Sequence, residues 1–430
     1  MSTQSRGEFG TGGVQTLRFI SGSRVRKINT RSFVRATRST GRDINRQIVL
    51  NLVREHQPIS RADLARRLGV TRGMVTSLID ELLREEAVYE GATVDAPRGR
   101  KPKMLYVRTR DRLVVAVDIR FSRTYVMLTD FAGTTIALET FDTVVDPPKL
   151  IAELARTIER MLATHGKGGQ CEGIGLVVPG MVDQRTGRVL NAPQLGWRGV
   201  DVRDALAAKT GLPVHIENAP VACALAQMWL GQRGASAPSD FVYLTVSDGV
   251  GAGVVVNGEV VRGSGGTAGE FGHIPISLDG PRCLCGSIGC LEAFTSNLAT
   301  LSRYLGHELS STSTRALLHQ SGLTINDLIG RARSGDERAH GALLETAHYL
   351  GVGIASLINA LNPSQIVVGG EITEYWDELE PAIREVVTAR ALTAAAAATP
   401  ILTEPAGEYP RLRGATAIVS APLFAAPRVA

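Results

Sequence analysis

Three cysteines and one histidine lie close together in the second half of the chain. Cys283, Cys285 and Cys290 fall within eight residues, and His273 precedes them by ten. One imidazole and three thiolates suit a tetrahedral structural zinc site, which leaves no position open for a catalytic water. A group of buried free thiols is the alternative. Three cysteines at this spacing with a histidine upstream favour zinc in a reducing cytosol over a disulfide framework.

A second group of residues has the types and spacing needed to bind DNA. Two short helical patterns, over 60–68 and 71–82, meet at Gly69, and a basic turn over 98–103 separates two apolar runs. This order is typical of a winged helix-turn-helix, whose last helix inserts its N-terminal side chains into the major groove. Wing cations neutralise phosphates or enter the minor groove. The residues predicted to contact DNA are Ser60, Arg61, Thr71, Arg72, Gly73, Thr76, Ser77, Arg98, Arg100 and Lys101.

Capping signals define the helices that hold these side chains. Asp43 is placed to cap a first helix, whose apolar side includes Ile48. Ser60 caps the second helix, with Asp63 as the acid of a capping box, and Thr71 caps the third. A small helical domain that binds another protein is the alternative interpretation. The basic wing and the charge distribution favour DNA.

Charge separates the front of the chain from the rest. Residues 1–110 hold 22 basic and 10 acidic side chains, whereas residues 111–430 hold 25 and 32. A basic front and an acidic rear indicate that only the front meets a polyanion. Residues 1–42 are polar and Arg-rich, and we expect a disordered basic tail that is either merely solvated or adds phosphate contacts.

The remaining residues alternate between strand and helix patterns. A strand over 113–119 is followed by a hairpin over 124–140, and a strand over 241–246 is followed by a hairpin over 252–261. This weak internal repeat predicts an α/β fold with two similar lobes facing a ligand cleft. The expected units are the winged helix-turn-helix over 43–110, a first lobe over 111–235 and a second lobe over 236–430. The second lobe contains the zinc loop, and the last helix is able to return to the first lobe.

Several motifs together resemble the ROK family of repressors and sugar kinases. Segment 265–273 looks like the ExGH motif of that family, and segment 283–292 looks like its CxCGxxGCxE zinc motif. Segments 179–180 and 191–193 look like its sugar-lobe motifs, and Asn362-Pro363 with Gly369-Gly370 resembles its nucleotide-side motif. The wing sequence at 99–102 resembles that of ROK repressors. The match covers roughly residues 43–425.

The resemblance implies an actin/hexokinase-like (ribonuclease H-like) fold, a sugar in the cleft and a homo-oligomer. The implied sugar-binding residues are Asn218, Glu270, His273 and Glu292. Carboxylates accept from sugar hydroxyls, whereas amide and imidazole N–H groups donate to them. His273 would then serve both zinc and sugar, so that the metal loop fixes the sugar site. Simpler roles stay open: Asn218 as a helix cap, Glu270 as a surface acid and Glu292 as a helix-start acid.

Two departures from the family pattern argue against kinase chemistry. Family kinases carry an Asp directly after the Asn as the catalytic base, but Ala219 occupies that position and cannot accept a proton. They also carry Asp-x-Gly-Gly-Thr after the first strand to cradle phosphate. Here the segment is Asp118-Ile119-Arg120-Phe121-Ser122, which removes the close backbone approach that glycine permits.

The sequence therefore predicts a cytoplasmic, non-enzymatic DNA-binding regulator, most consistent with a repressor. Its partners would be a double-stranded DNA operator, a sugar or sugar-derivative effector, and further copies of itself in a homodimer or homotetramer. We expect neither a membrane span nor an export signal. An active ROK sugar kinase with an accessory DNA-binding domain is one alternative. A regulator that responds to no sugar is another.

Overall fold

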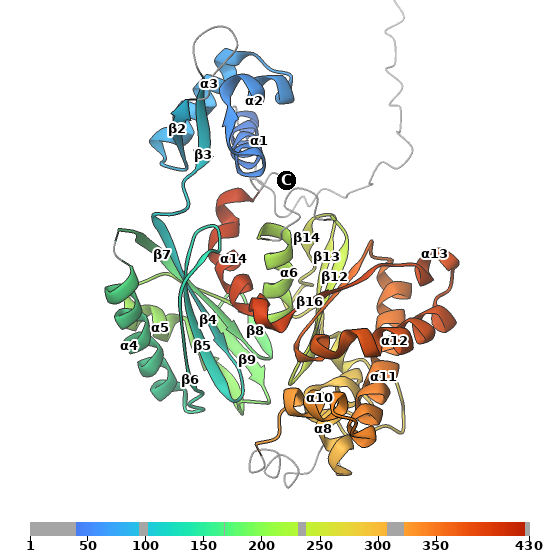
Figure 1. Cartoon of the computed structure of the whole chain (residues 1–430). Coiled ribbons are helices and arrows are strands. Elements are labelled where there is room, and N and C mark those ends of the chain that lie inside the picture. The colour runs from blue at the N-terminus through green and yellow to red at the C-terminus, as the bar shows by residue number, and fades with distance from the viewer. Residues whose placement is uncertain (1–39, 94–101, 167, 231–237, 308–321, 426–430) are drawn as a thin grey trace, which may run out of the picture.

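The structure is a computed structural model that describes residues 40–93, 102–166, 168–230, 238–307 and 322–425. A small helical unit sits above a larger body, in which two sheet-centred lobes stand side by side (Figure 1). The predicted wing tip, with Arg98, Arg100 and Lys101, and the tail before Thr40 lie outside the described residues. The predictions for those segments therefore stay predictions.

The N-terminal unit packs three helices against a small antiparallel sheet. Its helices are α1 (Thr40–His56), α2 (Arg61–Leu68) and α3 (Arg72–Arg84), and its strands β1 (Ile59–Ser60), β2 (Val88–Thr93) and β3 (Lys103–Val107) lie in the order β1-β3-β2. Ser60 and Thr71 cap α2 and α3, and their side chains accept the backbone N–H groups of Asp63 and Met74. Gly69 adopts the left-handed conformation that ends α2. These local elements agree with the sequence prediction.

Helix α1 differs from the prediction in its start and in its buried face. Residues 40–42, the first described ones, are already helical, so Asp43 does not cap α1 and the end of the predicted tail belongs to the helix. Val49, Leu50 and Val53 are buried, whereas Ile48 is 42% exposed. The sequence pattern placed Ile48 in the core. Helix α1 contacts α3 of its own unit and α14 of the larger body, and Ile48 lies outside both contacts.

The first lobe is a five-stranded sheet in the order β11-β7-β4-β5-β6. Its strands are β4 (Arg112–Ile119), β5 (Arg123–Asp130), β6 (Thr135–Asp142), β7 (Gln170–Val178) and β11 (Val214–Asn218). Helices α4 (Pro147–His165) and α5 (Arg203–Thr210) cover one face. A small sheet of β8 (Met181–Asp183), β9 (Arg188–Ala192) and β10 (Trp197–Asp201) lies beside it.

The second lobe repeats the same strand arrangement in the order β14-β13-β12-β15-β16. Its strands are β12 (Phe241–Val246), β13 (Val250–Val256), β14 (Glu259–Val260), β15 (Ile366–Gly369) and β16 (Ile401–Glu404). In both lobes an antiparallel hairpin is followed by two parallel neighbours. The internal repeat that the sequence indicated is therefore present in the fold.

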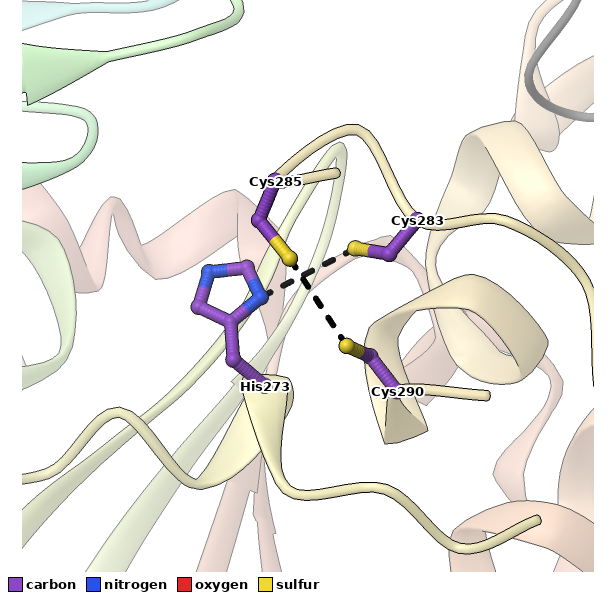
Figure 2. Close-up of side chains that lie close together, drawn as sticks. All are labelled: His273, Cys283, Cys285 and Cys290. Atoms are coloured by element: carbon purple, nitrogen blue, oxygen red, sulfur yellow. Dashed lines mark hydrogen bonds between the residues drawn. The ribbon is translucent and has the colours of Figure 1, made fainter. Parts of the chain in front are cut away.

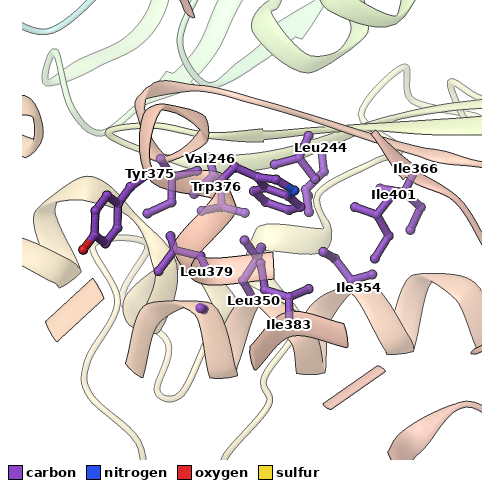
Figure 3. Packing of buried hydrophobic residues seen from close by; sticks show 14 of the residues in the cluster. Leu244, Val246, Leu350, Ile354, Ile366, Tyr375, Trp376, Leu379, Ile383 and Ile401 are labelled. Atoms are coloured by element: carbon purple, nitrogen blue, oxygen red, sulfur yellow. The ribbon is translucent and has the colours of Figure 1, made fainter. Parts of the chain in front are cut away.

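Helices form the remainder of the second lobe. They are η2 (Phe271–His273), α7 (Leu291–Thr295), α8 (Asn297–Leu305), α10 (Ile325–Arg333), α11 (Glu337–Leu361), η3 (Glu371–Tyr375), α12 (Trp376–Arg390) and α13 (Ala394–Ala397). Trp376, Leu379 and Ile383 of α12 pack against Leu350 and Ile354 of α11, over the apolar face of the sheet (Figure 3). This core fixes the position of η3 at the cleft.

Helix α11 is long and apolar enough, by length and composition alone, to cross a membrane. The sequence analysis expected no segment of that kind. In the structure, 61% of its apolar window is buried, and α11 lies against α7, α8, α10 and α12. That is the position of a central core helix, and its apolar composition follows from burial on several sides.

Two helices stand between the lobes (Figure 1). Helix α6 (Ala219–Trp229) packs on β12 and β13, while α14 (Pro410–Phe424), which follows η4 (Ala406–Glu408), packs on α6, β4 and β7. The two helices touch closely, because a Cβ atom on Gly414 would lie 2.5 Å from the carbonyl oxygen of Ala222. The last helix of the chain thus joins the first lobe.

Candidate functional site

A cleft opens between the two lobes. Its walls come from the ends of β4, β11, β12 and β15, the first turns of α6 and α14, and the loops around η2 and residue 284. Asn218, Glu270, His273 and Glu292 all line it. The four residues predicted to bind sugar therefore share one pocket, although they come from three separate segments of the chain.

Each of these side chains is positioned by its own element. The Asn218 side chain accepts the N–H of Val221 at 3.2 Å, so it caps α6 as well as facing the cleft. Glu292 lies in the first turn of α7, and its carboxylate accepts the N–H of Val250 at 2.9 Å. Burial raises the pKa of Glu292 and of Glu270. Carboxyl oxygens accept hydrogen bonds from sugar hydroxyls.

Gln194 also lines the cleft and was missed by the sequence analysis. A Cβ atom on Gly249 would lie 2.8 Å from its Nε2 and 3.0 Å from Glu292 Oε2, so the ends of both side chains lie close to Gly249. Gln194 directly follows the motif at 191–193, which was the available signal. A side-chain amide beside Glu292 adds a donor and an acceptor for a polyhydroxylated ligand.

Figure 2 shows how His273, Cys283, Cys285 and Cys290 converge. One donor atom from each lies within 4.8 Å of all the others, with Cys285 Sγ 3.7 Å from Cys290 Sγ and His273 Nδ1 3.8 Å from Cys283 Sγ. Burial raises the pKa of Cys290 to about 11 and raises that of Cys283 as well. Buried thiols of this kind ionise at neutral pH beside a cation, so the cluster is suited to hold a metal ion.

His273 connects this cluster with the cleft. Its Nδ1 faces the sulfur atoms, and its Nε2 lies 3.8 Å from Glu270 Oε2. The imidazole therefore stands between the metal-binding loop and a carboxylate of the cleft. A metal ion on Nδ1 would fix the ring and leave the Nε2–H to donate toward the cleft.

The candidate DNA surface is the exposed start of α3. Thr71, Arg72, Gly73, Thr76 and Ser77 are all exposed, and the buried face of α3 is formed by Val75, Leu78, Ile79 and Leu82. Two further predicted residues have structural partners. Ser60 is buried as the cap of α2, and Arg61 pairs with Asp80 at 2.9 Å and with Glu90. Ser77 accepts a hydrogen bond from Arg42 at 2.7 Å.

The comparisons with known proteins cover both parts of the chain. A model of the ROK family matches residues 114–421, and a model of the MarR family matches residues 47–90. The chain belongs to the ROK family. The family and the two-part fold that the sequence motifs predicted are thereby confirmed.

The relatives include regulators and kinases. The xylose repressor of Caldicellulosiruptor bescii is 31% identical over 358 residues, covering 82% of this chain and 89% of the repressor. A solved ROK family transcriptional regulator, described as a homolog of the E. coli MLC protein, matches 90% of this chain and 97% of its own with a TM-score of 0.73 at 26% identity. A ROK glucokinase from Streptomyces griseus was solved with glucose and AMPPNP. The match covers 71% of this chain and 98% of the glucokinase, with a TM-score of 0.60 at 26% identity. Of these three proteins, the two that match more than four fifths of this chain are a repressor and a transcriptional regulator.

In this ROK protein, charged side chains fill the end of the cleft where β4 ends. Asp118 is fully buried and pairs with Arg120 at 2.7 Å and with Arg411 at 2.9 Å. Arg120 also pairs with Glu371 of the second lobe at 3.1 Å. Burial opposes the charge on Arg120, but attraction to Asp118 and Glu371 raises its pKa overall. Sequence analysis identified the loss of glycine at position 120 but not the ion pairs that replace it.

Asp248 is a further acid of the cleft that the sequence analysis did not identify. It lies in the turn between β12 and β13 and is partly buried. Burial raises the pKa of Asp248, and the nearby negative charge of Glu371 raises it further. Ala219 also lines the cleft, and its side chain is only a methyl group beside Asn218. Position 219 therefore offers no proton acceptor for an attacking hydroxyl.

Proposed function

We propose that this ROK protein is a DNA-binding transcriptional repressor whose cleft binds a sugar without phosphorylating it. The winged helix-turn-helix would bind an operator through the start of α3, and the cleft would bind the effector through Asn218, Glu270, His273 and Glu292. Similarity to the xylose repressor and to the solved regulator supports the proposal. The absence of an acid at position 219 supports a binding role over catalysis.

The observation that carries the proposal is that α6 and α14 each run from the cleft to the DNA-binding unit. Asn218 and Arg411, at the starts of these helices, line the cleft. At the other ends, the guanidinium carbon of Arg54 in α1 lies 5.0 Å from the Trp229 ring centre and 4.7 Å from that of Phe424. A cation between two aromatic rings is a specific attachment point.

Hydrogen bonds secure the same joint. Gln47 and Asn51 of α1 donate to the backbone carbonyl oxygens of Leu423 and Phe424, at 2.6 and 2.9 Å. The apolar cluster of the N-terminal unit continues into Phe131 and Phe424 of the larger body. A shift of α6 or α14 when the cleft changes would therefore move α1. The chain would then have two arrangements, one before and one after the cleft changes. The ligand changes the affinity for DNA only to the extent that the ligand's own affinity differs between these two arrangements.

Replacing Arg54 by glutamine should uncouple the two sites. In the unaltered chain we expect the sugar to weaken DNA binding by about 5- to 150-fold. In the Arg54→Gln variant, the DNA affinities with and without sugar should be nearly equal, so that the ratio of the two is close to one. The measurement is fluorescence anisotropy with the DNA upstream of the chain's own gene, with and without the sugar that binds best among D-xylose, D-glucose and D-glucosamine. Arg156→Gln, which alters an exposed side chain of α4, is the matched control. An unchanged ratio in Arg54→Gln would contradict the proposed joint.

We propose that the metal ion is zinc in a structural role. Zinc bonds to sulfur are about 2.3 Å long, so two tetrahedral thiolate ligands lie about 3.8 Å apart. The 3.7 Å between Cys285 Sγ and Cys290 Sγ is consistent with that geometry. All four ligand positions are taken by the protein, so zinc would hold the loop and His273 in place and supply no activated water.

The rival function, an active sugar kinase, is supported by the likeness to the glucokinase. We predict no ATP turnover above background with any hexose, pentose or amino sugar. We also predict none for Ala219→Asp, because Arg120 and its partners would still fill the end of the cleft. A coupled ADP-release assay measures both, with a ROK glucokinase as positive control. ATP turnover by the unaltered chain would contradict the proposed binding role and support the function of a sugar kinase.

The proposal includes a homo-oligomer in the cytoplasm. A dimer would present two α3 helices to two operator half-sites about one helical turn apart, or a multiple of that spacing. Homo-oligomers with closed symmetry are the usual form of such regulators. Light scattering of the full chain with and without operator DNA tests this part directly.

A further inference from the structure

Helices α6 and α14, which stand between the lobes, are seated on different lobes. Helix α6 packs on β12 and β13 of the second lobe, where its Cys223 and Ala224 join the apolar cluster of those strands. Helix α14 packs on β4 and β7 of the first lobe, where its Leu412 and Ala415 are buried against those strands. We therefore expect each helix to follow the lobe on which it is seated.

Glycines bring both helices close to the backbones of these strands. A Cβ atom on Gly253 of β13 would lie 2.3 Å from the carbonyl oxygen of Pro220 in α6. A Cβ atom on Gly175 of β7 would lie 1.8 Å from the carbonyl oxygen of Ala415 in α14. Interiors packed this closely transmit displacement rather than absorb it. A change in the angle between the lobes should therefore move α6 relative to α14.

Arg413 of α14 connects these two bodies. It pairs with Glu404 of β16, in the second lobe, at 3.1 Å. It also donates to the carbonyl oxygen of Leu230, the residue that ends α6, at 2.6 Å. A third contact, with Glu408 at 3.4 Å, stays within the segment that leads into α14. One side chain of the first-lobe helix thus holds both the second-lobe sheet and the end of α6.

The ion pair between Arg413 and Glu404 is largely buried. The Glu404 side chain is 5% exposed and that of Arg413 is 20% exposed. Separating the two would leave a buried carboxylate without this cation, which is far more costly than loosening an ion pair on the surface. Interfaces of this kind favour two discrete arrangements over a continuous range.

The contacts of Arg413 lie next to the joint with the DNA-binding unit. Leu230 directly follows Trp229, whose ring is one of the two that enclose Arg54 of α1. The other ring, that of Phe424, lies at the end of α14. Movement of one lobe relative to the other therefore changes the spacing of the two rings around the guanidinium group. The attraction between a cation and a ring extends only to about 6 Å, so this spacing matters.

We propose that Arg413 is a latch between the lobes, whose contacts with Glu404 and Leu230 hold α6 and α14 in the arrangement of this structure. Breaking the latch would release the end of α6 and change the spacing of the rings around Arg54. This proposal rests on the proposed function, because it names the contact through which the cleft controls DNA binding. Sugar and DNA then favour opposite states of the latch. By linkage, loss of the latch strengthens the binding of one of them and weakens the binding of the other.

Removal of the latch should therefore shift the two affinities in opposite directions. The double variant Glu404→Gln/Arg413→Gln removes both charges and leaves neither buried alone. Relative to the unaltered chain, its sugar affinity and its DNA affinity should change by at least about threefold in opposite senses. Calorimetry gives the affinity for whichever of D-xylose, D-glucose and D-glucosamine binds best. Fluorescence anisotropy gives the DNA affinity, at the sugar concentration that releases half of the DNA from the unaltered chain.

Two further variants separate a latch from a merely structural contact. Glu380→Gln/Arg384→Gln in α12 is the matched control, because Arg384 also pairs with a glutamate, at 3.3 Å, and donates to a backbone carbonyl oxygen, at 2.8 Å. It should leave both affinities unchanged. Arg413→Lys keeps a cation for Glu404 but loses the planar fork that reaches two acceptors at once. Its shifts should have the same senses as those of the double variant and be smaller.

The outcomes separate the latch from the proposed function. Affinities that both fall, or both stay the same, in Glu404→Gln/Arg413→Gln would overturn the latch and leave the proposed function standing. If that variant does not fold, the fluorescence of Trp229 decides, in a chain with Trp197→Phe and Trp376→Phe that has no other tryptophan. Saturating sugar should change this emission, because the cation beside the ring would move. An unchanged emission while DNA is released would overturn the latch. If no sugar alters DNA binding by the unaltered chain, the proposed function is contradicted and the latch with it.

Discussion

Removal of the metal ion should abolish sugar binding while leaving DNA binding in place. Cys290→Ser, or treatment with a strong chelator, should lower the free energy of unfolding of the second lobe by several kcal/mol, since structural zinc contributes about 10 kcal/mol or more in small domains. His273 would lose the ion that orients its ring beside Glu270. The apolar cluster of the DNA-binding unit shares no residue with the cluster around Cys283 and Cys290.

Three measurements together test this expectation. Elemental analysis gives the metal content, thermal unfolding gives the stability, and calorimetry gives the affinity for the best-binding sugar. Cys171→Ser, which alters a free thiol on β7 outside the cluster, is the matched control. Sugar binding that survives in a metal-free protein would show that the loop and the pocket are independent, and the proposed double role of His273 would be wrong.

Loss of the Arg72 side chain should weaken operator binding and reduce sequence preference. Arg72 is exposed at the first turn of α3. If it contacts a base, Arg72→Ala should cost about 1–3 kcal/mol and relax the preference at one base pair. The affinity of the unaltered chain should also fall about a thousandfold between 50 and 200 mM salt if the protein contacts six or more phosphates.

Competition between operator and unrelated DNA distinguishes the loss of a base contact from the loss of a phosphate contact. Arg72→Ala should lose more affinity for the operator than for unrelated duplex, whereas loss of a phosphate contact would weaken both equally. Arg156→Ala, on α4 of the first lobe, should change neither affinity. Equal affinity of wild type and Arg72→Ala for the operator at every salt concentration would exclude Arg72 from the interface.

Local elements were predictable because their signals lie within a few residues. The caps at Ser60 and Thr71 and the turn at Gly69 each depend on a residue type at one position. The metal cluster was predictable for the same reason, since three of its four members lie within eight residues. The cleft residues were found through family motifs rather than from spacing.

The interactions that connect these elements were not predictable from one sequence. Arg120 and Glu371 are 251 positions apart, and Asn51 donates to a carbonyl 373 positions away. Ile48 followed the helical pattern of a core position yet is 42% exposed, and periodicity did not indicate that α1 would also pack against α14. Such pairings depend on the tertiary arrangement, which periodicity does not specify.

The central claim is that one chain binds DNA and changes its DNA affinity when it binds a sugar, without modifying that sugar. The most direct test is one titration of the full chain on fluorescent DNA from its own upstream region, at low salt, with sugar added and ADP monitored in parallel with ATP present. We predict tight binding, release of DNA by an unphosphorylated sugar and no ADP. DNA binding that is absent at low salt, or ADP formed in proportion to the sugar, would contradict the account.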